Sequence, residues 1–190
     1  MENVFRALAL IAGLLFTVAV VQTITSKKIE TLKMSAGISF PDVASIKTRE
    51  KELNCLAINI YREAGHEPFE GKVAVAQVTM NRVKDINFPN DVCGVVYQKT
   101  TALKTVCQFS WYCDATHRNR PINAKAYEES YEVAKKVLLE NFRLDILKTA
   151  LYYHADYVNP QWRLEKIGQI GAHIFYSEKP KTVQRLYAKL

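Results

Sequence analysis

The sequence lacks the residue patterns of the common cofactor-dependent and repeat architectures. Only seven of its 190 residues are glycine, and they form no glycine-rich phosphate loop. Its four cysteines include no C-x-x-C pair and no zinc-finger spacing, so they indicate neither a zinc site nor thioredoxin-like redox chemistry. There is no internal repeat. A chain of this length buries one core, so we expect a single cofactor-free domain with an N-terminal appendage.

Acidic residues are also in the minority. The chain has 26 Lys and Arg against 19 Asp and Glu, which gives a formal net charge of +7. A basic protein suits an anionic partner such as a membrane surface, a nucleic acid or a polymer that carries acidic peptides, and charge alone does not choose among them. Because no nucleic-acid-binding motif accompanies the charge, we expect no nucleic-acid partner.

The only long apolar run lies at the N-terminus. Residues 7–21 (ALALIAGLLFTVAVV) contain a single threonine, and basic residues lie on both sides. Extended to Ile24, the run just reaches the length that spans a bilayer, and no A-x-A cleavage site follows it. We expect a signal peptide or signal anchor over residues 1–25, a linker over 26–47 and the folded domain over 48–190. The protein would then be membrane-tethered through this helix or secreted.

The stretch from residue 53 to 83 carries the main candidate for chemistry. Glu63 follows a helical stripe of apolar residues and lies at its edge. Gly65 permits a turn, and Pro68 suits the first position of a second helix. That helix, over residues 72–83, is apolar nearly all round and is expected in the core. The stripe consists of Leu53, Leu56, Ala57, Ile60, Tyr61 and Ala64.

This placement predicts a raised pKa for Glu63. Apolar surroundings disfavour the charged carboxylate, and the negative end of a helix dipole repels an anion. A carboxylic acid that keeps its proton near neutral pH is what general-acid catalysis requires. The alternative is an ordinary surface glutamate near a helix end.

Three blocks of the chain resemble the SleB/CwlJ-type cell wall hydrolases, the spore-cortex-lytic family. The first resembles the motif E-A-x-G-E-P, followed by G-x-V-A-V-A and N-R-V, although glycine stands one position early, at Gly65. The matching residues of this block are Glu63, Ala64, Glu67, Pro68, Gly71, 73–76 and 81–83. The other blocks are residues 88–98 with 107–114, and 150–162 with 167–176.

The resemblance implies a fold and an activity. The fold would be α+β, a mainly helical, lysozyme-like catalytic domain with a small antiparallel sheet. The enzyme would cleave peptidoglycan glycan strands between N-acetylmuramic acid and N-acetylglucosamine, as a lytic transglycosylase with Glu63 as its single catalytic acid. Two alternatives remain open: an N-acetylmuramoyl-L-alanine amidase, which usually needs zinc, or a non-catalytic, membrane-anchored peptidoglycan-binding module.

A hydrolysing glycosidase needs a second carboxylate. Glu67, Glu70 and Asp114 are weaker candidates than Glu63, and Glu67 is expected to cap the second helix. Aromatic and amide side chains suit a sugar-binding cleft, where rings stack on pyranose faces. The expected substrate-binding residues are Glu67, Gln108, Ser110, Trp111, Tyr152, Tyr153, His154 and Trp162. His154 and His173 suggest a metal pair, but a hydrogen-bonding role is favoured and no metal is expected.

The remaining expectations concern the pairing of the cysteines and the secondary structure of the C-terminal half. Cys107 and Cys113 bracket one loop, Cys93 competes for either, and Cys55 is expected to be a buried free thiol. Asn123 is expected to cap a helix whose apolar stripe runs to Phe142. The period then changes to two, which predicts short strands at residues 150–154 and 170–176 joined by a loop over 159–166.

Overall fold

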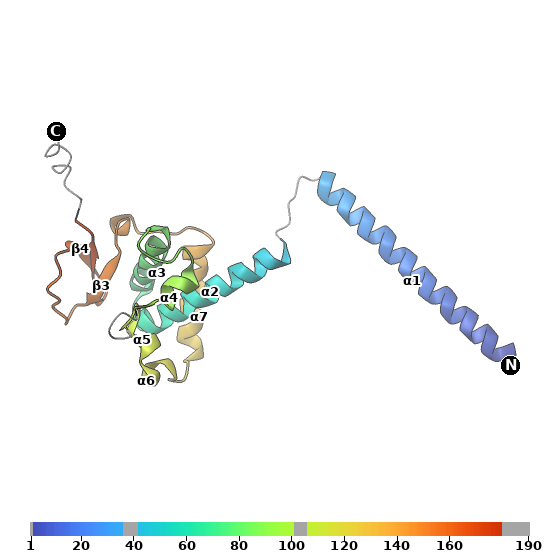
Figure 1. Cartoon of the computed structure of the whole chain (residues 1–190), viewed down its shortest axis with the longest axis horizontal. Coiled ribbons are helices and arrows are strands. Elements are labelled where there is room, and N and C mark those ends of the chain that lie inside the picture. Colours follow the sequence, from blue (N-terminus) through green and yellow to red (C-terminus); the bar gives the residue numbers. More distant parts are fainter. Residues whose placement is uncertain (1, 36–41, 101–105, 180–190) are drawn as a thin grey trace. The chain divides into compact units, whose positions relative to one another are not determined.

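The computed structural model describes residues 2–35, 42–100 and 106–179. The chain forms two compact units, residues 1–45 and 46–190. In the first unit, α1 runs from Glu2 to Ser35, through residues 26–35 where the sequence predicted a linker (Figure 1). Among the described residues, no helix is long and apolar enough to cross a membrane, in contrast to the membrane helix expected over residues 1–25. The apolar run ends at residue 21, and polar residues follow it within α1.

The second unit is built on helices α2 (Val43–Ala64), α3 (Phe69–Lys84) and α7 (Ala124–Leu138). Helix α3 is central, because residues 71–79 are all buried. Its small side chains let α7 pack closely against it, and the short α4 (Val92–Val96) packs on it as well (Figure 1). The prediction of a core helix over residues 72–83 is therefore confirmed.

Helix α7 begins where the sequence predicted but ends earlier. The side chain of Asn123 accepts a hydrogen bond from the backbone N–H of Ala126, which is the expected N-cap. The helix stops at Leu138, and Asn141 then adopts a positive φ of 56° that no helix accommodates. Phe142, expected on the helical stripe, lies beyond the helix and contacts the ring edge of Phe69.

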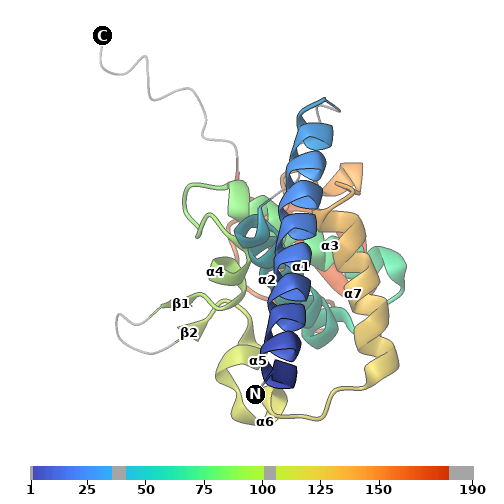
Figure 2. The same ribbon diagram turned by 90° about the vertical axis from the view of Figure 1, so that its right-hand side faces the viewer.

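Short elements connect these helices. Helices α5 (Ser110–Cys113) and α6 (Ala115–Arg118) and the 3-10 turn η1 (Asp145–Leu147) each span about one turn. Strands β1 (Lys99–Thr100) and β2 (Val106–Cys107) pair antiparallel at one side of the unit (Figure 2).

Two disulfides cross-link the unit. Cys107 pairs with Cys113, which closes the loop that the sequence analysis singled out. Cys55 pairs with Cys93, so the expectation of a free thiol at Cys55 is wrong. The two cysteines are 38 residues apart, and the packing of α4 against α2 that brings them together leaves no mark on the local sequence.

A three-stranded antiparallel sheet completes the fold. Its strands are β3 (Tyr152–Ala155), β4 (Glu165–Ile170) and β5 (His173–Ser177), in the order β3-β5-β4. β5 pairs with β3 as predicted. The strand predicted over residues 170–176 is, however, interrupted by a turn at residues 171 and 172, and residues 165–170 before that turn form the additional strand β4. Phe175 on β5 is fully buried against Ala74 and Val78 of α3, which places one face of the sheet on the helical core. The fold is thus mostly helical with small antiparallel sheets, as expected.

Candidate active site

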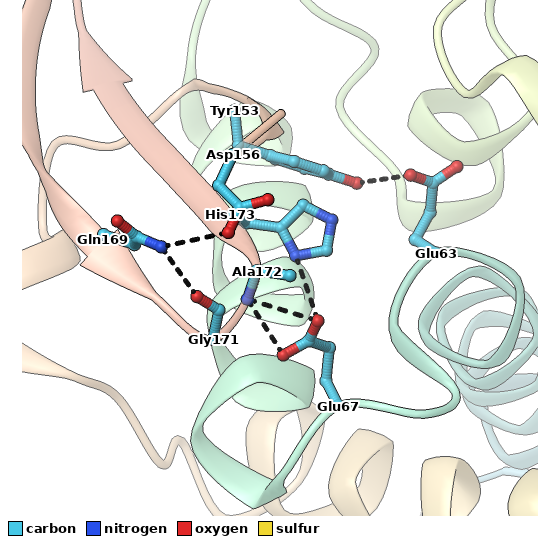
Figure 3. Close-up of polar contacts among 8 residues, drawn as sticks. All are labelled: Glu63, Glu67, Tyr153, Asp156, Gln169, Gly171, Ala172 and His173. Carbon is cyan, nitrogen blue, oxygen red and sulfur yellow. Dashed lines mark hydrogen bonds and ion pairs between the residues drawn. The ribbon is translucent and has the colours of Figure 1, made fainter. Parts of the chain in front are cut away.

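Glu63 lies in the last turn of α2, at the edge of the buried face of the helix. Its neighbours Ile60 and Ala64 are buried, while Glu63 itself keeps partial contact with solvent. Across from it, Tyr153 on β3 donates a hydrogen bond from its hydroxyl to Oε2 of Glu63 at 3.0 Å (Figure 3). The carboxyl is therefore held between the helical core and the sheet, with one oxygen occupied.

The environment of Glu63 raises its pKa. Burial is the largest cause, because it disfavours the ionised form. The hydrogen bond from Tyr153 and the positive charge of Arg82 act in the opposite direction, and burial outweighs both. The direction agrees with the expectation from the sequence. A partly accessible carboxylic acid with a raised pKa can donate a proton near neutral pH.

Arg82 on α3 connects this helix to the strand that carries Tyr153. Its guanidinium is buried, which lowers its pKa, and its Nε donates to the carbonyl oxygen of Leu151 at 2.8 Å. It also lies over the rings of Phe88 and Phe109, at 5.4 and 5.2 Å from their centroids. Arg82 thereby ties the start of β3 to α3, so that Tyr153 on the same strand reaches Glu63.

A cleft of about 200 Å³ opens beside Glu63. Its wall carries Glu63 and Glu67 together with the cationic side chains of Arg62 and Arg120 and the imidazole of His117. Arg62 donates to the carbonyl oxygens of residues 118 and 120, at 3.0 Å each, and so fixes that loop to α2. A larger groove of about 660 Å³ lies between the start of α3 and α7, but Glu63 is not on its wall. The smaller cleft is therefore the candidate active site.

The weaker carboxylates have other partners. Glu67 does not cap α3, whose N-cap is Pro68 without a side-chain hydrogen bond. Instead, both Glu67 oxygens accept from the backbone N–H of Ala172 in the β4–β5 turn, at 3.3 and 3.2 Å (Figure 3). Asp114 caps α6, and hydrogen bonds from Thr116 and His117 hold its pKa well below its usual range. Asp114 is therefore ionised and cannot serve as a proton donor near neutral pH.

The disulfide-closed loop turns two aromatic rings inward. Trp111 is buried, and its Nε1 donates to Oδ1 of Asn59 at 3.0 Å. Phe109 is also part of the core. Trp111 also lies on the wall of the cleft, whereas Ser110 is exposed and Gln108 is partly exposed. The loop therefore serves mainly to close the core beneath the cleft.

The sheet separates the predicted sugar-binding aromatics. Adjacent residues of a strand point to opposite faces, so Tyr153 faces Glu63 while Tyr152 and His154 face away. On that outer face, His154 stacks on Tyr176 at 5.3 Å, and Trp162 packs edge-on against His154 at 5.4 Å. Of the four aromatic candidates in this block, the structure brings only Tyr153 to Glu63.

Comparison with known proteins identifies the family of this chain. The sequence profile described as Cell Wall Hydrolase matches residues 66–176, more than half of the chain. The chain belongs to the Cell Wall Hydrolase family. The resemblance to SleB/CwlJ-type hydrolases is thereby confirmed. Glu63 lies three residues before the matched range, so its role rests on the geometry described above.

Several relatives of this cell wall hydrolase are spore cortex-lytic enzymes. The Bacillus subtilis enzyme is 31% identical over 132 residues, which are 65% of this chain and 37% of that protein. The Bacillus cereus enzyme is 32% identical over 134 residues, 66% of this chain and 44% of that protein. The chain thus aligns with less than half the length of these relatives.

Two solved structures also match. One is the catalytic domain of Bacillus cereus SleB, with 27% identity and a TM-score of 0.49 over 67% of this chain and 91% of that one. The other is the catalytic domain of the germination-specific lytic transglycosylase SleB from Bacillus anthracis, with 29% identity and the same TM-score over 66% and 93%.

The two histidines considered as a metal pair, His154 and His173, do not lie together. In β3 and β5, His154 is paired with Ile174 and His173 with Ala155, so the two histidines lie on opposite faces of the sheet. In the part of the chain that the structure describes, one group of three potential ligands occurs, made of Glu52, Asp91 and Cys93. The sulfur of Cys93 is bonded to Cys55, so this group does not offer three free ligand atoms.

Sequence reasoning missed three contributors to the site. Arg82 belongs to the N-R-V motif, and a charged residue in an otherwise apolar core helix was a signal that it has a buried partner. Gly171 has a φ of +58°, which only the backbone reveals. For His173 the sequence favoured a hydrogen-bonding role but named no partner, and its place near Glu67 depends on the register of β5 with β3.

Proposed function

We propose that this cell wall hydrolase cleaves the glycan strand of peptidoglycan, between N-acetylmuramic acid and N-acetylglucosamine, with Glu63 as the general acid. The observation that carries the proposal is the partly accessible, raised-pKa carboxyl of Glu63 in a cleft, with Tyr153 on one oxygen. Because Oε2 accepts from Tyr153, the acidic proton belongs on Oε1. That oxygen can protonate the glycosidic oxygen as the bond breaks.

We further propose that the reaction is that of a lytic transglycosylase. After the first proton transfer, Glu63 is a carboxylate and can take the proton from the C6 hydroxyl of the muramic acid. That hydroxyl then attacks the anomeric carbon and closes a 1,6-anhydro ring, so no water and no second carboxylate act in the step. The placement supports this route, because Asp114 caps α6 and Glu67 is bonded to the β4–β5 turn. The lytic transglycosylase SleB of Bacillus anthracis is a relative with a related activity.

Digestion of purified sacculi in heavy-oxygen water tests the proposal. We expect products that end in 1,6-anhydro-muramic acid and carry no label. Label on a new anomeric carbon would show hydrolysis and overturn the transglycosylase route, while leaving cleavage of the glycan in place. A Glu63→Gln variant keeps the shape but removes the proton, and we expect its turnover to fall on the order of a hundredfold or more. A variant that retained half of the wild-type rate would contradict the role of Glu63.

The place of action follows from the substrate. Peptidoglycan lies outside the cytoplasm, and both disulfides of the catalytic unit are typical of proteins that fold in an oxidising compartment. We therefore propose that the protein is exported to the cell envelope.

A further inference from the structure

The carboxylate of Glu67 lies in a space that two glycines leave open. Gly71 is in the first turn of α3, and a Cβ there would lie 2.8 Å from the Cβ of Glu67 and 2.9 Å from its Oε2. Gly171 is in the β4–β5 turn, and a Cβ there would collide with the same Oε2. Two positions 100 residues apart in the chain thus lack side chains at the point where this carboxylate lies.

Glu67 links the sheet to the helices. It precedes α3, yet its oxygens accept the N–H of Ala172 in the β4–β5 turn of the sheet. The side chain is 16% exposed. An ionised carboxylate has room for about four hydrogen bonds, so one N–H leaves it with free acceptor positions. One of them faces Nδ1 of His173, which is 4.0 Å from Oε1.

His173 has a ring nitrogen that can pair with this carboxylate. Its Nδ1 is buried and has no hydrogen-bond partner among the described residues. Its ring meets the ring of Tyr153 edge-on, with 5.1 Å between the centroids. Figure 3 shows the imidazole between Glu67 and the Tyr153–Glu63 pair, with its other ring nitrogen turned toward the Glu63 side. The separation of 4.0 Å closes with a small side-chain movement or through one water.

Burial lowers the pKa of His173, and this keeps the ring neutral near neutral pH. The titratable groups around His173 shift this pKa in opposite directions. Glu67 and Asp156 favour the protonated ring, whereas His154 disfavours it. A neutral imidazole carries its proton on one nitrogen only, and the partner of that nitrogen decides which one.

We propose that Glu67 is a positioning residue of this site, which holds the β4–β5 turn and directs the Nδ1–H of His173 to its own carboxylate. The Nε2 lone pair of His173 then faces the Glu63 side as a hydrogen-bond acceptor for a substrate hydroxyl. This last role rests on the proposed function, whereas the tautomer of His173 does not depend on it.

Nitrogen NMR of the full chain, labelled with 15N at histidine, tests the tautomer. The chain has four histidines, and a His173→Gln variant assigns the signal of His173. We expect the neutral ring of the wild type to carry its proton on Nδ1. In Glu67→Gln that preference should weaken, and the pKa of His173 should fall because the carboxylate that raises it is gone. A wild-type ring protonated on Nε2, or a tautomer that Glu67→Gln leaves unchanged, overturns the proposal.

Kinetics provide the second readout. We expect Glu67→Gln to lower kcat about tenfold with little change in KM, because Glu67 orients His173 and does not itself bind the substrate. Gly171→Ala should act in the same direction, because its methyl group displaces the carboxylate. Glu165→Gln removes an exposed glutamate from the same sheet and should match the wild type. Thermal unfolding of each variant shows which of them fold. If Glu67→Gln does not fold, the tautomer of His173 in Gly171→Ala decides, and if Gly171→Ala does not fold, Glu67→Gln decides.

The two proposals fail separately. Inactivity of the wild type on peptidoglycan would count against the proposed function while the NMR result still tested Glu67. An active enzyme whose kcat is unaffected by Glu67→Gln would overturn the positioning role of Glu67 alone.

Discussion

At the scale of single residues, two opposing influences determine the pKa of Glu63. Burial in the last turn of α2 raises the pKa of Glu63, and the hydroxyl of Tyr153 and the charge of Arg82 limit the rise. Burial therefore favours the protonated carboxyl of Glu63 while this residue keeps its place on the wall of the cleft. The raised pKa of Glu63 also lowers the stability of the folded protein near neutral pH.

Glu63→Gln should make the protein more stable near neutral pH. The folded-state pKa of Glu63 lies above the unfolded value, so the folded state binds more protons and loses stability as the pH rises through these values. Glutamine removes this penalty. Chemical denaturation should show a higher free energy of unfolding for the variant at pH 7, and the difference should vanish below the ordinary carboxyl value of 4.5. A variant less stable than the wild type at pH 7 would contradict the burial argument.

Tyr153→Phe should move the pH profile of the enzyme. The hydroxyl lowers the pKa of Glu63, so its loss lets that pKa rise further. The basic limb of kcat/KM, where Glu63 loses its proton, should shift to higher pH. The maximal rate should fall about tenfold, because the proton is no longer confined to one oxygen. Tyr152→Phe is the matched control, since Tyr152 is on the outer face of the sheet, and it should leave the limb in place.

At the scale of elements, the cleft is made where a helix end, a loop and a sheet meet. Helix α2 supplies Glu63, strand β3 supplies Tyr153, and the loop closed by Cys107 and Cys113 fills the space beneath them. The two disulfides act on different elements. Cys55–Cys93 joins α2 to α4, whereas Cys107–Cys113 joins β2 to α5.

Replacing each disulfide with a pair of serines should therefore have different effects. The loop closed by Cys55 and Cys93 is longer, 38 residues against 6. Chain entropy predicts a loss of about 4 kcal/mol for the longer loop and about 2 kcal/mol for the shorter one. We expect the Cys107/Cys113 variant to fold and to show a raised KM. Unfolding curves and sacculus digestion check this, and equal destabilisation by both pairs would contradict it.

At the scale of the whole molecule, the catalytic unit follows an N-terminal unit whose helix α1 includes the apolar run. Two disulfides and a cell-wall substrate class are typical of proteins that work outside the cytoplasm, and they support the export proposed above. We propose that the segment before residue 46, which contains the apolar run, directs the export.

A fusion of residues 1–50 to a reporter that is active only outside the cytoplasm should therefore report export. Replacing two leucines of the apolar run, Leu14 and Leu15, with lysine should abolish the signal, because a signal sequence needs an uninterrupted apolar segment. Full reporter activity in that variant, or none with the natural segment, would contradict the proposal.

The sequence by itself determined the parts of this protein that local patterns specify. The stripe that ends at Glu63, the apolar run of α3 and the Asn123 cap of α7 were predictable, because helical periodicity and capping depend on residues a few positions apart. The direction of the pKa shift of Glu63 followed from the same local pattern. The motif blocks also sufficed to place the chain in its family.

The tertiary structure decided which distant residues meet. The register of β3 with β5 sends Tyr153 to Glu63 and Tyr152 to the other face, and a shift of one residue would have exchanged them. The docking of α4 on α2 pairs Cys55 with Cys93, and the turn at Gly171 brings Ala172 to Glu67 rather than leaving Glu67 to cap α3. These contacts join residues 38 to 105 positions apart, where no local pattern records them.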